Sequence, residues 1–340
     1  MNRRSAILLG VFGLLAMVAA LFAPVASALA AVPPTVSQPE VPDPADDMAR
    51  IEKSGKLVVG TSANYPPFEF YNSNFDLDGF DIALMRELGK RLGVEVVFND
   101  FAFNGLLDAV QLGQVDAAIA AISVTPDRMQ EVDFTNLYYL GQDAALVSKQ
   151  FEGDIRSATD LAGLKIGVER GTTYQSWAQQ HVVDKGLTPQ ENLLAYDNAS
   201  AMVRDLRNGT IDVALMGLLP ARQAEVRSTD LKIGGTGYNQ QQFAIAARKE
   251  SSLIGALNRV LGEIQSDGTF AKLVTQYLNM DADEVTPDEE AAVVENKPAE
   301  PPLPTTTVTE TVVVVEQPCV LGMAFVADVN LNDYNMTAPR

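Results

Sequence analysis

The strand and helix pattern of residues 51–280 occurs twice, and this repetition most limits the folds open to the chain. In the first half, a short apolar strand at 56–60 precedes a helix with apolar residues every three or four positions. A continuous apolar strand at 116–122 then follows. In the second half, a strand at 165–168, a helix and a strand at 211–216 stand in the same order. This alternation predicts α/β architecture with largely parallel sheets.

A Gly-x-x-Asp string joins helix to strand in each half, at Gly113–Asp116 and at Gly209–Asp212. Their equivalent places predict two similar lobes rather than one long sheet. Two further strands, at 143–147 and 243–247, stand where the chain would have to cross between lobes. We therefore predict an α/β fold of two lobes, each a mixed, mostly parallel sheet flanked by helices, with a two-strand hinge.

The N-terminal residues 1–31 have the features of a secretory signal peptide. Arg3 and Arg4 precede an apolar run at 6–23, and small residues then offer a cleavage site at Ala28-x-Ala30. We therefore expect an exported protein, periplasmic or at the extracytoplasmic cell surface. The alternative is an uncleaved membrane anchor, because the run is about long enough to span a bilayer.

The remaining segments outside the lobes differ in composition from the core. The resulting division is a Pro-rich spacer at 32–50, lobe 1 at 51–143 and 244–280, lobe 2 at 144–243, an acidic Pro/Thr-rich linker at 281–318 and an incomplete β-type segment at 319–340.

Charge and composition exclude several classes of function. The net charge is −19, and residues 281–340 hold twelve acidic residues against two basic ones, so much of this charge lies in the predicted linker. The acidity argues against nucleic-acid binding. A single cysteine, Cys319, and a single histidine, His181, exclude thiolate clusters, internal disulfides and multi-His metal sites. Gly-rich phosphate loops are absent, and we predict no cofactor.

Polar residues at the predicted strand ends are candidates for ligand binding, because ligands of open α/β sheets bind beyond the carboxyl ends of strands. Arg128 follows the strand that ends near Ser123 and could hold a carboxylate in a two-pronged contact. The alternative is a surface ion pair of Arg128 with Asp127 or Glu131.

Two other pairs of residues can also be interpreted either as ligand-binding or as structural. Thr172 and Thr173, after Gly171, open a helix and could bind an anion, or they could simply cap that helix. Tyr65 and Phe103 could enclose a ligand between aromatic rings, or pack in the core.

A catalytic interpretation has little support. His181 lies in a predicted helix, and no nucleophilic residue stands at a spacing that would indicate a catalytic pair. We therefore expect His181 at the surface. We predict no catalytic residues and no metal ligands.

Several strings together resemble the bacterial extracellular solute-binding proteins of family 3, the polar amino-acid receptors of ABC importers. They stand in the expected order: GTSANYPPFEF at 60–70, GFDIA at 79–83, AISVTPDR at 121–128, VDFT at 132–135 and GTT at 171–173. The resemblance covers residues 51–280 and implies a periplasmic-binding-protein-like fold that closes on a small ligand.

The resemblance also implies roles for individual residues. Arg128 would hold the ligand α-carboxylate with Thr172 and Thr173, while Ser123 and the carbonyl of Ala121 would meet the α-ammonium. Tyr65 and Phe103 would enclose the ligand side chain. The implied partners are an amino acid or similar small carboxylate and an ABC permease, and we expect a monomer.

The chain departs from the family pattern at two positions. Gly217 stands where relatives usually have the Asp that pairs with the α-ammonium, and Ser62 stands where receptors for cationic or amide side chains often have Asp. An unpaired buried ammonium is costly. Either Glu169, whose matched position also lines the family pocket, replaces the acid, or the ligand has no α-ammonium.

Two other functions remain as alternatives. The linkers and the short C-terminal segment are compatible with a ligand-sensing module of a larger surface protein. The lost Asp is compatible with an enzyme like cyclohexadienyl dehydratase on the same scaffold, with Glu169 as general acid.

Overall fold

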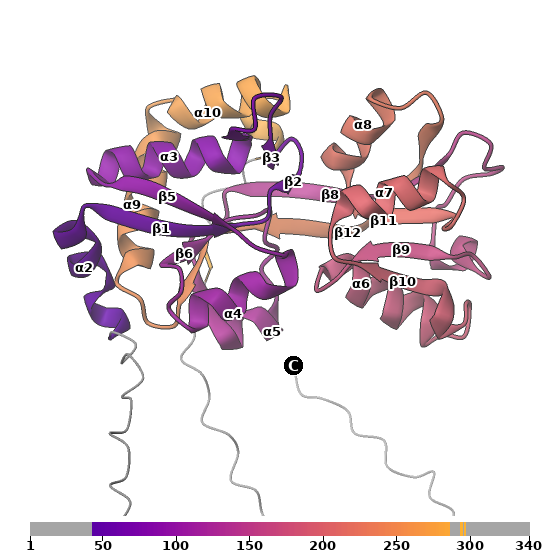
Figure 1. Cartoon of the computed structure of the whole chain (residues 1–340), viewed down its shortest axis with the longest axis horizontal. Coiled ribbons are helices and arrows are strands. Elements are labelled where there is room, and N and C mark those ends of the chain that lie inside the picture. The colour runs from indigo at the N-terminus through magenta and orange to yellow at the C-terminus, as the bar shows by residue number, and fades with distance from the viewer. Residues whose placement is uncertain (1–42, 286–292, 295, 297–340) are drawn as a thin grey trace, which may run out of the picture. The chain divides into compact units, whose positions relative to one another are not determined.

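Two five-stranded sheets of mixed direction organise the chain (Figure 1). The structure is a computed structural model and describes residues 43–285, 293, 294 and 296. The predicted two-lobed α/β fold class is confirmed. The strands of the first sheet, in spatial order, are β5 Glu95–Asp100, β1 Lys56–Thr61, β6 Ala117–Ala118, β13 Ala246–Arg248 and β7 Val132–Phe134. Strand β1 runs parallel to β5 and β6, whereas β13 is antiparallel to β6 and β7.

Helices cover both faces of the first sheet, with α3 and α10 on one side and α4 and α5 on the other (Figure 1). The longest, α9, buries Leu257, Leu261 and Ile264 on one stripe, as the spacing of an amphipathic helix requires. The elements of this lobe are α2 Asp47–Ser54, α3 Phe80–Leu92, α4 Leu106–Gln111, α5 Pro126–Glu131, α9 Leu253–Ser266, α10 Thr269–Leu273 and a small sheet of β2 Asn64–Tyr65, β3 Glu69–Tyr71 and β4 Leu77–Asp78.

The second sheet has the spatial order β10, β9, β11, β8, β12. Strand β9 is parallel to β10 and β11, and β8 is antiparallel to β11 and β12. The elements of this lobe are β8 Tyr139–Ser148, β9 Ile166–Glu169, α6 Thr173–Ala178, β10 Leu193–Tyr196, α7 Ala199–Arg207, β11 Val213–Gly217, α8 Leu218–Val226 and β12 Leu231–Phe243.

The chain crosses between the lobes along β8 and β12 (Figure 1). Residues 139–142 pair with 240–243, and an isolated bridge joins Phe243 to Ser123 of the first lobe. The crossing therefore lies a few residues before the segments expected from the sequence. Residues 143–147 instead pair with β11 inside the second sheet.

Described residues beyond 280 pack on the first lobe. Leu140 N donates to Val285 O over 2.6 Å. The Asn296 side chain makes two hydrogen bonds to the backbone of Phe134, accepting from its N at 2.9 Å and donating to its O at 2.7 Å. The predicted signal at 1–31 and segment at 319–340 lie outside the described residues. Within the described ranges, no helix has the length and apolar character needed to cross a membrane.

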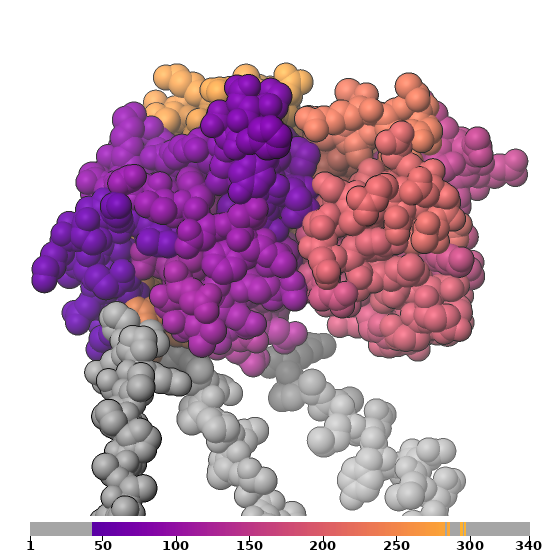
Figure 2. Space-filling model, in the orientation of Figure 1, coloured from indigo at the N-terminus to yellow at the C-terminus, as the bar shows by residue number. Residues whose placement is uncertain are grey.

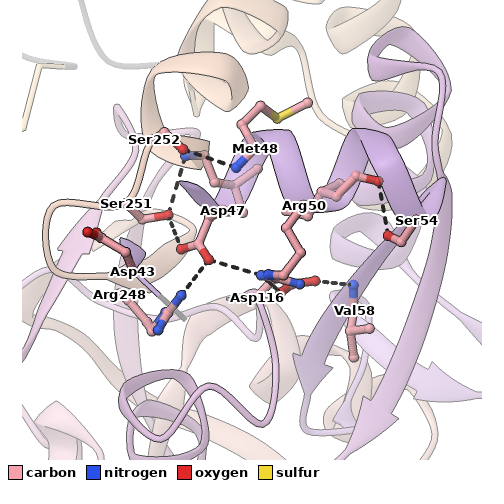
Figure 3. Close-up of polar contacts among 12 residues, drawn as sticks. Asp43, Asp47, Met48, Arg50, Ser54, Val58, Asp116, Arg248, Ser251 and Ser252 are labelled. Atoms are coloured by element: carbon pink, nitrogen blue, oxygen red, sulfur yellow. Dashed lines mark hydrogen bonds and ion pairs between the residues drawn. The ribbon is translucent and has the colours of Figure 1, made fainter. Parts of the chain in front are cut away.

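Helix α2 begins inside the range predicted as a spacer, because residues 44–50 are helical. Its first residue, Asp47, is fully buried and joins α2 to the region after β13 (Figure 3). Asp47 accepts hydrogen bonds from Arg248, from Arg50 at 2.9 Å and from Ser251 at 2.7 Å. Arg50 also reaches Asp116 at 2.5 Å. This network fastens the N-terminal helix to the first lobe.

Loss of Asp47 should strongly destabilise this lobe. Burial by itself raises the Asp47 pKa, but hydrogen bonds from Ser251, Arg248 and Arg50 outweigh burial and hold the pKa below its ordinary value. Asp47→Ala leaves buried Arg248 without this carboxylate, and we expect the unfolding free energy to fall by about 3–5 kcal/mol. Urea unfolding at pH 7 measures this change.

The matched control is Asp46→Ala, since Asp46 is exposed and makes no capping hydrogen bond. Its cost should stay within about 0.5 kcal/mol. Because the folded-state pKa of Asp47 is depressed, its contribution is present above the unfolded-state pKa of about 3.9 and is lost as the pH falls through the folded-state pKa. Equal effects of the two variants at pH 7 would contradict the assigned role of the network.

Candidate functional site

A cavity lies between the lobes, beside the carboxyl ends of strands β1, β6 and β9. The lining residues come from both lobes: Ser62, Asn64, Tyr65, Glu69, Phe103, Ala120, Ala121, Ser123, Arg128, Glu169, Thr172, Thr173 and Tyr174.

Eight of the nine residues predicted to contact a ligand line this cavity, and Gly217 does not. Their role in binding stays a prediction. Of the five other lining residues, Ser62 was noted in the sequence as a departure from the family pattern, and four were missed: Asn64, Glu69, Ala120 and Tyr174. Two of them could have been predicted as lining residues, because Asn64 and Glu69 stand inside the string at 60–70 that carried the family resemblance.

Arg128 is held at the cavity by backbone oxygens of both lobes. Its Nη1 donates to Ser123 O at 2.6 Å and its Nη2 to Gly171 O at 2.9 Å. The guanidinium lies 5.5 Å from the centre of the Phe103 ring. Burial lowers the Arg128 pKa to about 10, so the side chain stays protonated at neutral pH. Among the described residues Arg128 forms no ion pair, so the alternative pairing with Asp127 or Glu131 is absent.

Gln241, on the crossing strand β12, connects hydroxyls of the two lobes. Ser123 Oγ donates to Gln241 Oε1 at 2.5 Å, and Thr173 Oγ1 donates to the same oxygen at 2.9 Å. Thr172 caps α6 by accepting from Gln175 N at 3.3 Å, so the capping interpretation of this residue is confirmed. Capping does not occupy Thr173, whose side chain remains at the cavity.

Glu169, the last residue of β9, is 5% exposed, and its Oε1 has no hydrogen-bond partner. Burial raises its pKa to about 7, against a smaller lowering by the Asn64 side chain. A carboxyl group at this position therefore changes its protonation state near neutral pH.

Glu69 and Asp81 form a buried carboxyl pair, 1% and 0% exposed. Asp81 Oδ2 accepts from Ala121 N at 2.7 Å and from Tyr138 Oη at 2.9 Å. Burial raises both pKa values, that of Asp81 to about 6, while that of Glu69 lies well above its ordinary value because Asp81 is beside it. At pH 7 the pair therefore shares one proton, held on Glu69, and Asp81 is the ionised acceptor.

Ala121 has a φ of +45°, in the left-handed region that a residue with a Cβ seldom adopts. The hydrogen bond from its N–H to Asp81 holds this strained conformation at the cavity wall. For this reason strand β6 ends at Ala118, and the continuous strand predicted at 116–122 is too long.

Gly217 lies against two tyrosine hydroxyls that come from different lobes. Its N donates to Tyr65 Oη at 2.6 Å, and Tyr65 Oη lies 3.3 Å from Tyr174 Oη. A Cβ at Gly217 would lie 2.9 Å from Tyr65 Oη and 3.2 Å from Tyr174 Oη. The space beside Gly217, where the resemblance places a carboxylate, is therefore filled by phenol groups.

His181 is exposed, as predicted, with its ring stacked on Trp177. Among the residues that the structure describes, no group of three or more His, Cys, Asp or Glu is arranged to hold a metal ion.

Sequence comparison identifies relatives for the part of the chain that builds the cavity. Residues 57–280 match the family described as bacterial extracellular solute-binding proteins, family 3. The L-cystine-binding protein TcyJ of Escherichia coli (strain K12) is 32% identical over 234 residues, covering 68% of this chain and 86% of that protein. The histidine-binding periplasmic protein of Salmonella typhimurium is 30% identical over 236 residues, covering 66% and 88% respectively.

Several solved structures with the same fold are more than 25% identical to this chain in sequence. An ancestral arginine-binding protein bound to glutamine has a TM-score of 0.62 and 33% identity, covering 66% of this chain and 99% of that chain. An ancestral amino acid-binding protein, AncCDT-1, described as a precursor of cyclohexadienyl dehydratase, has a TM-score of 0.62 and 28% identity, covering 68% and 98%.

Gly217→Ala should destabilise the contact between the lobes. The φ of −64° at Gly217 suits any residue, so the cost comes from the Cβ that meets the tyrosine hydroxyls. We expect a loss of about 1–3 kcal/mol in unfolding free energy. Tyr65→Phe removes the nearer hydroxyl, so Gly217→Ala should cost less in that background, with a coupling of about 0.5–3 kcal/mol in a double-mutant cycle. Simple additivity of the two changes would contradict this contact.

Proposed function

Because this chain belongs to the bacterial extracellular solute-binding proteins of family 3, we propose that its cavity captures an amino acid and that the protein delivers it to an ABC permease. The observation that carries the ligand class is Arg128, a cation at the cavity without a carboxylate partner among the described residues. A partly buried cation without a counter-charge favours an anionic ligand group. A guanidinium is the side chain best suited to a carboxylate.

The acid side of the cavity favours a ligand that also carries a positive charge. Glu169 lines the same cavity as Arg128 and forms no ion pair among the residues described. A zwitterion complements both signs of charge, whereas a simple carboxylate complements only one. Glu169 then takes the ammonium, since Gly217 offers no carboxylate.

The other predicted site residues complete this arrangement. Thr172 and Thr173 support the ligand carboxylate from lobe 2, and Ser123 and the Ala121 carbonyl contact the nitrogen from lobe 1. Tyr65 and Phe103 enclose the side chain. The two lobes, 51–143 with 244–280 and 144–243, close on the ligand about the crossing strands.

The relatives also bear on location and on the alternatives. The histidine-binding relative is named as periplasmic, which supports export of this chain. An enzyme and a sensing module remain less favoured, because the matched family is one of solute-binding proteins.

Arg128→Ala should reduce amino-acid affinity by about 100-fold or more, because the ligand carboxylate loses its charged partner. Isothermal titration with L-cystine, L-histidine, L-arginine and L-glutamine at pH 8 measures the effect. Arg128→Lys keeps the charge but not the two-pronged geometry and should recover only part of the affinity.

Arg170→Ala is the matched control, since Arg170 directly follows the cavity residue Glu169 in the chain but does not line the cavity and pairs with Asp197. It should retain the affinity of the unaltered protein. Unchanged affinity in Arg128→Ala would remove the carboxylate role, and failure of every amino acid to bind the unaltered protein would remove the proposed function.

A further inference from the structure

Three carboxyl groups gather on one side of the cavity. Glu169 comes from β9 of the second lobe, Glu69 from β3 of the first lobe and Asp81 from α3 behind it. Each is at least nine-tenths buried, and each has one oxygen without a hydrogen-bond partner: Glu169 Oε1, Glu69 Oε2 and Asp81 Oδ1. Glu169 and Glu69 line the cavity itself, so their unpartnered carboxyl groups are placed where a ligand would lie.

The three carboxyls differ in how strongly the protein fixes their charge. Asp81 is held ionised by the Ala121 N–H and the Tyr138 hydroxyl, and Glu69 is held protonated by its burial and by that ionised neighbour. Glu169 has neither an ionised partner nor backbone donors to its carboxylate, and only the Asn64 side chain supports its charged form. Glu169 is therefore the group whose protonation a ligand can change.

We propose that Glu169 exchanges its proton for the positively charged nitrogen of the ligand, so that binding at this cavity releases a proton to the solvent. The empty site holds a neutral Glu169 carboxyl group, and the ligand enters as a zwitterion. The O–H bond of Glu169 breaks, its proton leaves to water or buffer, and the resulting carboxylate pairs with the ammonium. Charge balances, because the site becomes one unit more negative when the zwitterion binds and the released proton carries the matching positive charge. This inference rests on the proposed amino-acid function.

Burying a charged ammonium beside a neutral acid would be costly, which is why exchange is favoured over simple addition. The other groups facing Glu169 do not compete for the proton near neutral pH. Burial raises the pKa values of Tyr65 and Tyr174, so both hydroxyls stay neutral. Glu69 keeps its proton, and Arg128 keeps its charge. Tyr196, beside Glu169 on β10, has a pKa raised to about 12.

The direction of the pH effect follows from the raised Glu169 pKa of about 7 in the empty site. Above this value the carboxylate is already present and binding releases no proton. Below it, affinity should fall by up to about tenfold per pH unit, because Glu169 must first lose its proton.

Isothermal titration of the full chain with L-arginine and L-glutamine, in buffers of different ionisation enthalpy, measures the protons released. Neither probe has a group that titrates between pH 6 and 8 in water. We expect about one proton per ligand at pH 6 and close to none at pH 8.5. Binding without proton release at pH 6 would overturn this inference and leave the proposed function standing. Failure of every amino acid to bind would instead remove both.

Two glutamine substitutions identify the acid that exchanges. Glu169→Gln should abolish proton release and bind about tenfold or more weakly at pH 8, with its affinity approaching that of the unaltered protein as the pH falls to 5.5. Glu69→Gln replaces a carboxyl group that is already neutral, and it should keep the proton release. Release that persists in Glu169→Gln, or that disappears only in Glu69→Gln, would overturn the assignment to Glu169.

Discussion

The cavity depends on a partly buried positive charge that the protein solvates but does not neutralise. Carbonyl oxygens of Ser123 and Gly171, one from each lobe, and the ring of Phe103 surround the Arg128 guanidinium. These groups keep it protonated, yet they supply no counter-charge. Because its two hydrogen-bond acceptors lie in different lobes, the position of Arg128 depends on how the lobes meet. Under the proposed function, closure and carboxylate recognition are the same event.

Gln241 extends this dependence to the strands that connect the lobes. Its side-chain oxygen accepts from Ser123 in the first lobe and from Thr173 in the second, while its backbone belongs to β12. The hydroxyls beside Arg128 are therefore positioned relative to the crossing strands as well as to their own lobes. On the other side of the cavity, Asp81 fixes the strained backbone of Ala121. Both walls thus depend on residues outside the predicted site.

Most of the fold and of the cavity lining could be predicted because both depend on local patterns. Two facing lobes bring the carboxyl ends of their strands around one cleft, so Arg128 and Glu169 could be placed together from the sequence. The contacts that could not be predicted join distant residues: Tyr65 and Tyr174 are 109 positions apart, and Asp47 and Arg248 are 201 apart. Asp47 lies in a Pro-rich range without strong helical periodicity. The crossing was misplaced because its segments contain Gln142, Gln240 and Gln241, which interrupt the apolar pattern.

The cavity has its acidic side chain at Glu169 rather than beside Gly217, and this position decides which groups act on the pKa of that acid. A carboxylate beside Gly217 would compete for space with Tyr65 and Tyr174, whose hydroxyls already satisfy the Gly217 N–H and one another. At Glu169 the carboxyl lies next to Asn64 of the opposite lobe and near Glu69. Asn64 in turn accepts from Ala199 N at 2.8 Å, a further direct hydrogen bond between the lobes. Opening the lobes would separate Glu169 from Asn64 and change its exposure to water, and both groups of contacts act on its pKa. The protonation of Glu169 and the closure of the lobes are therefore coupled.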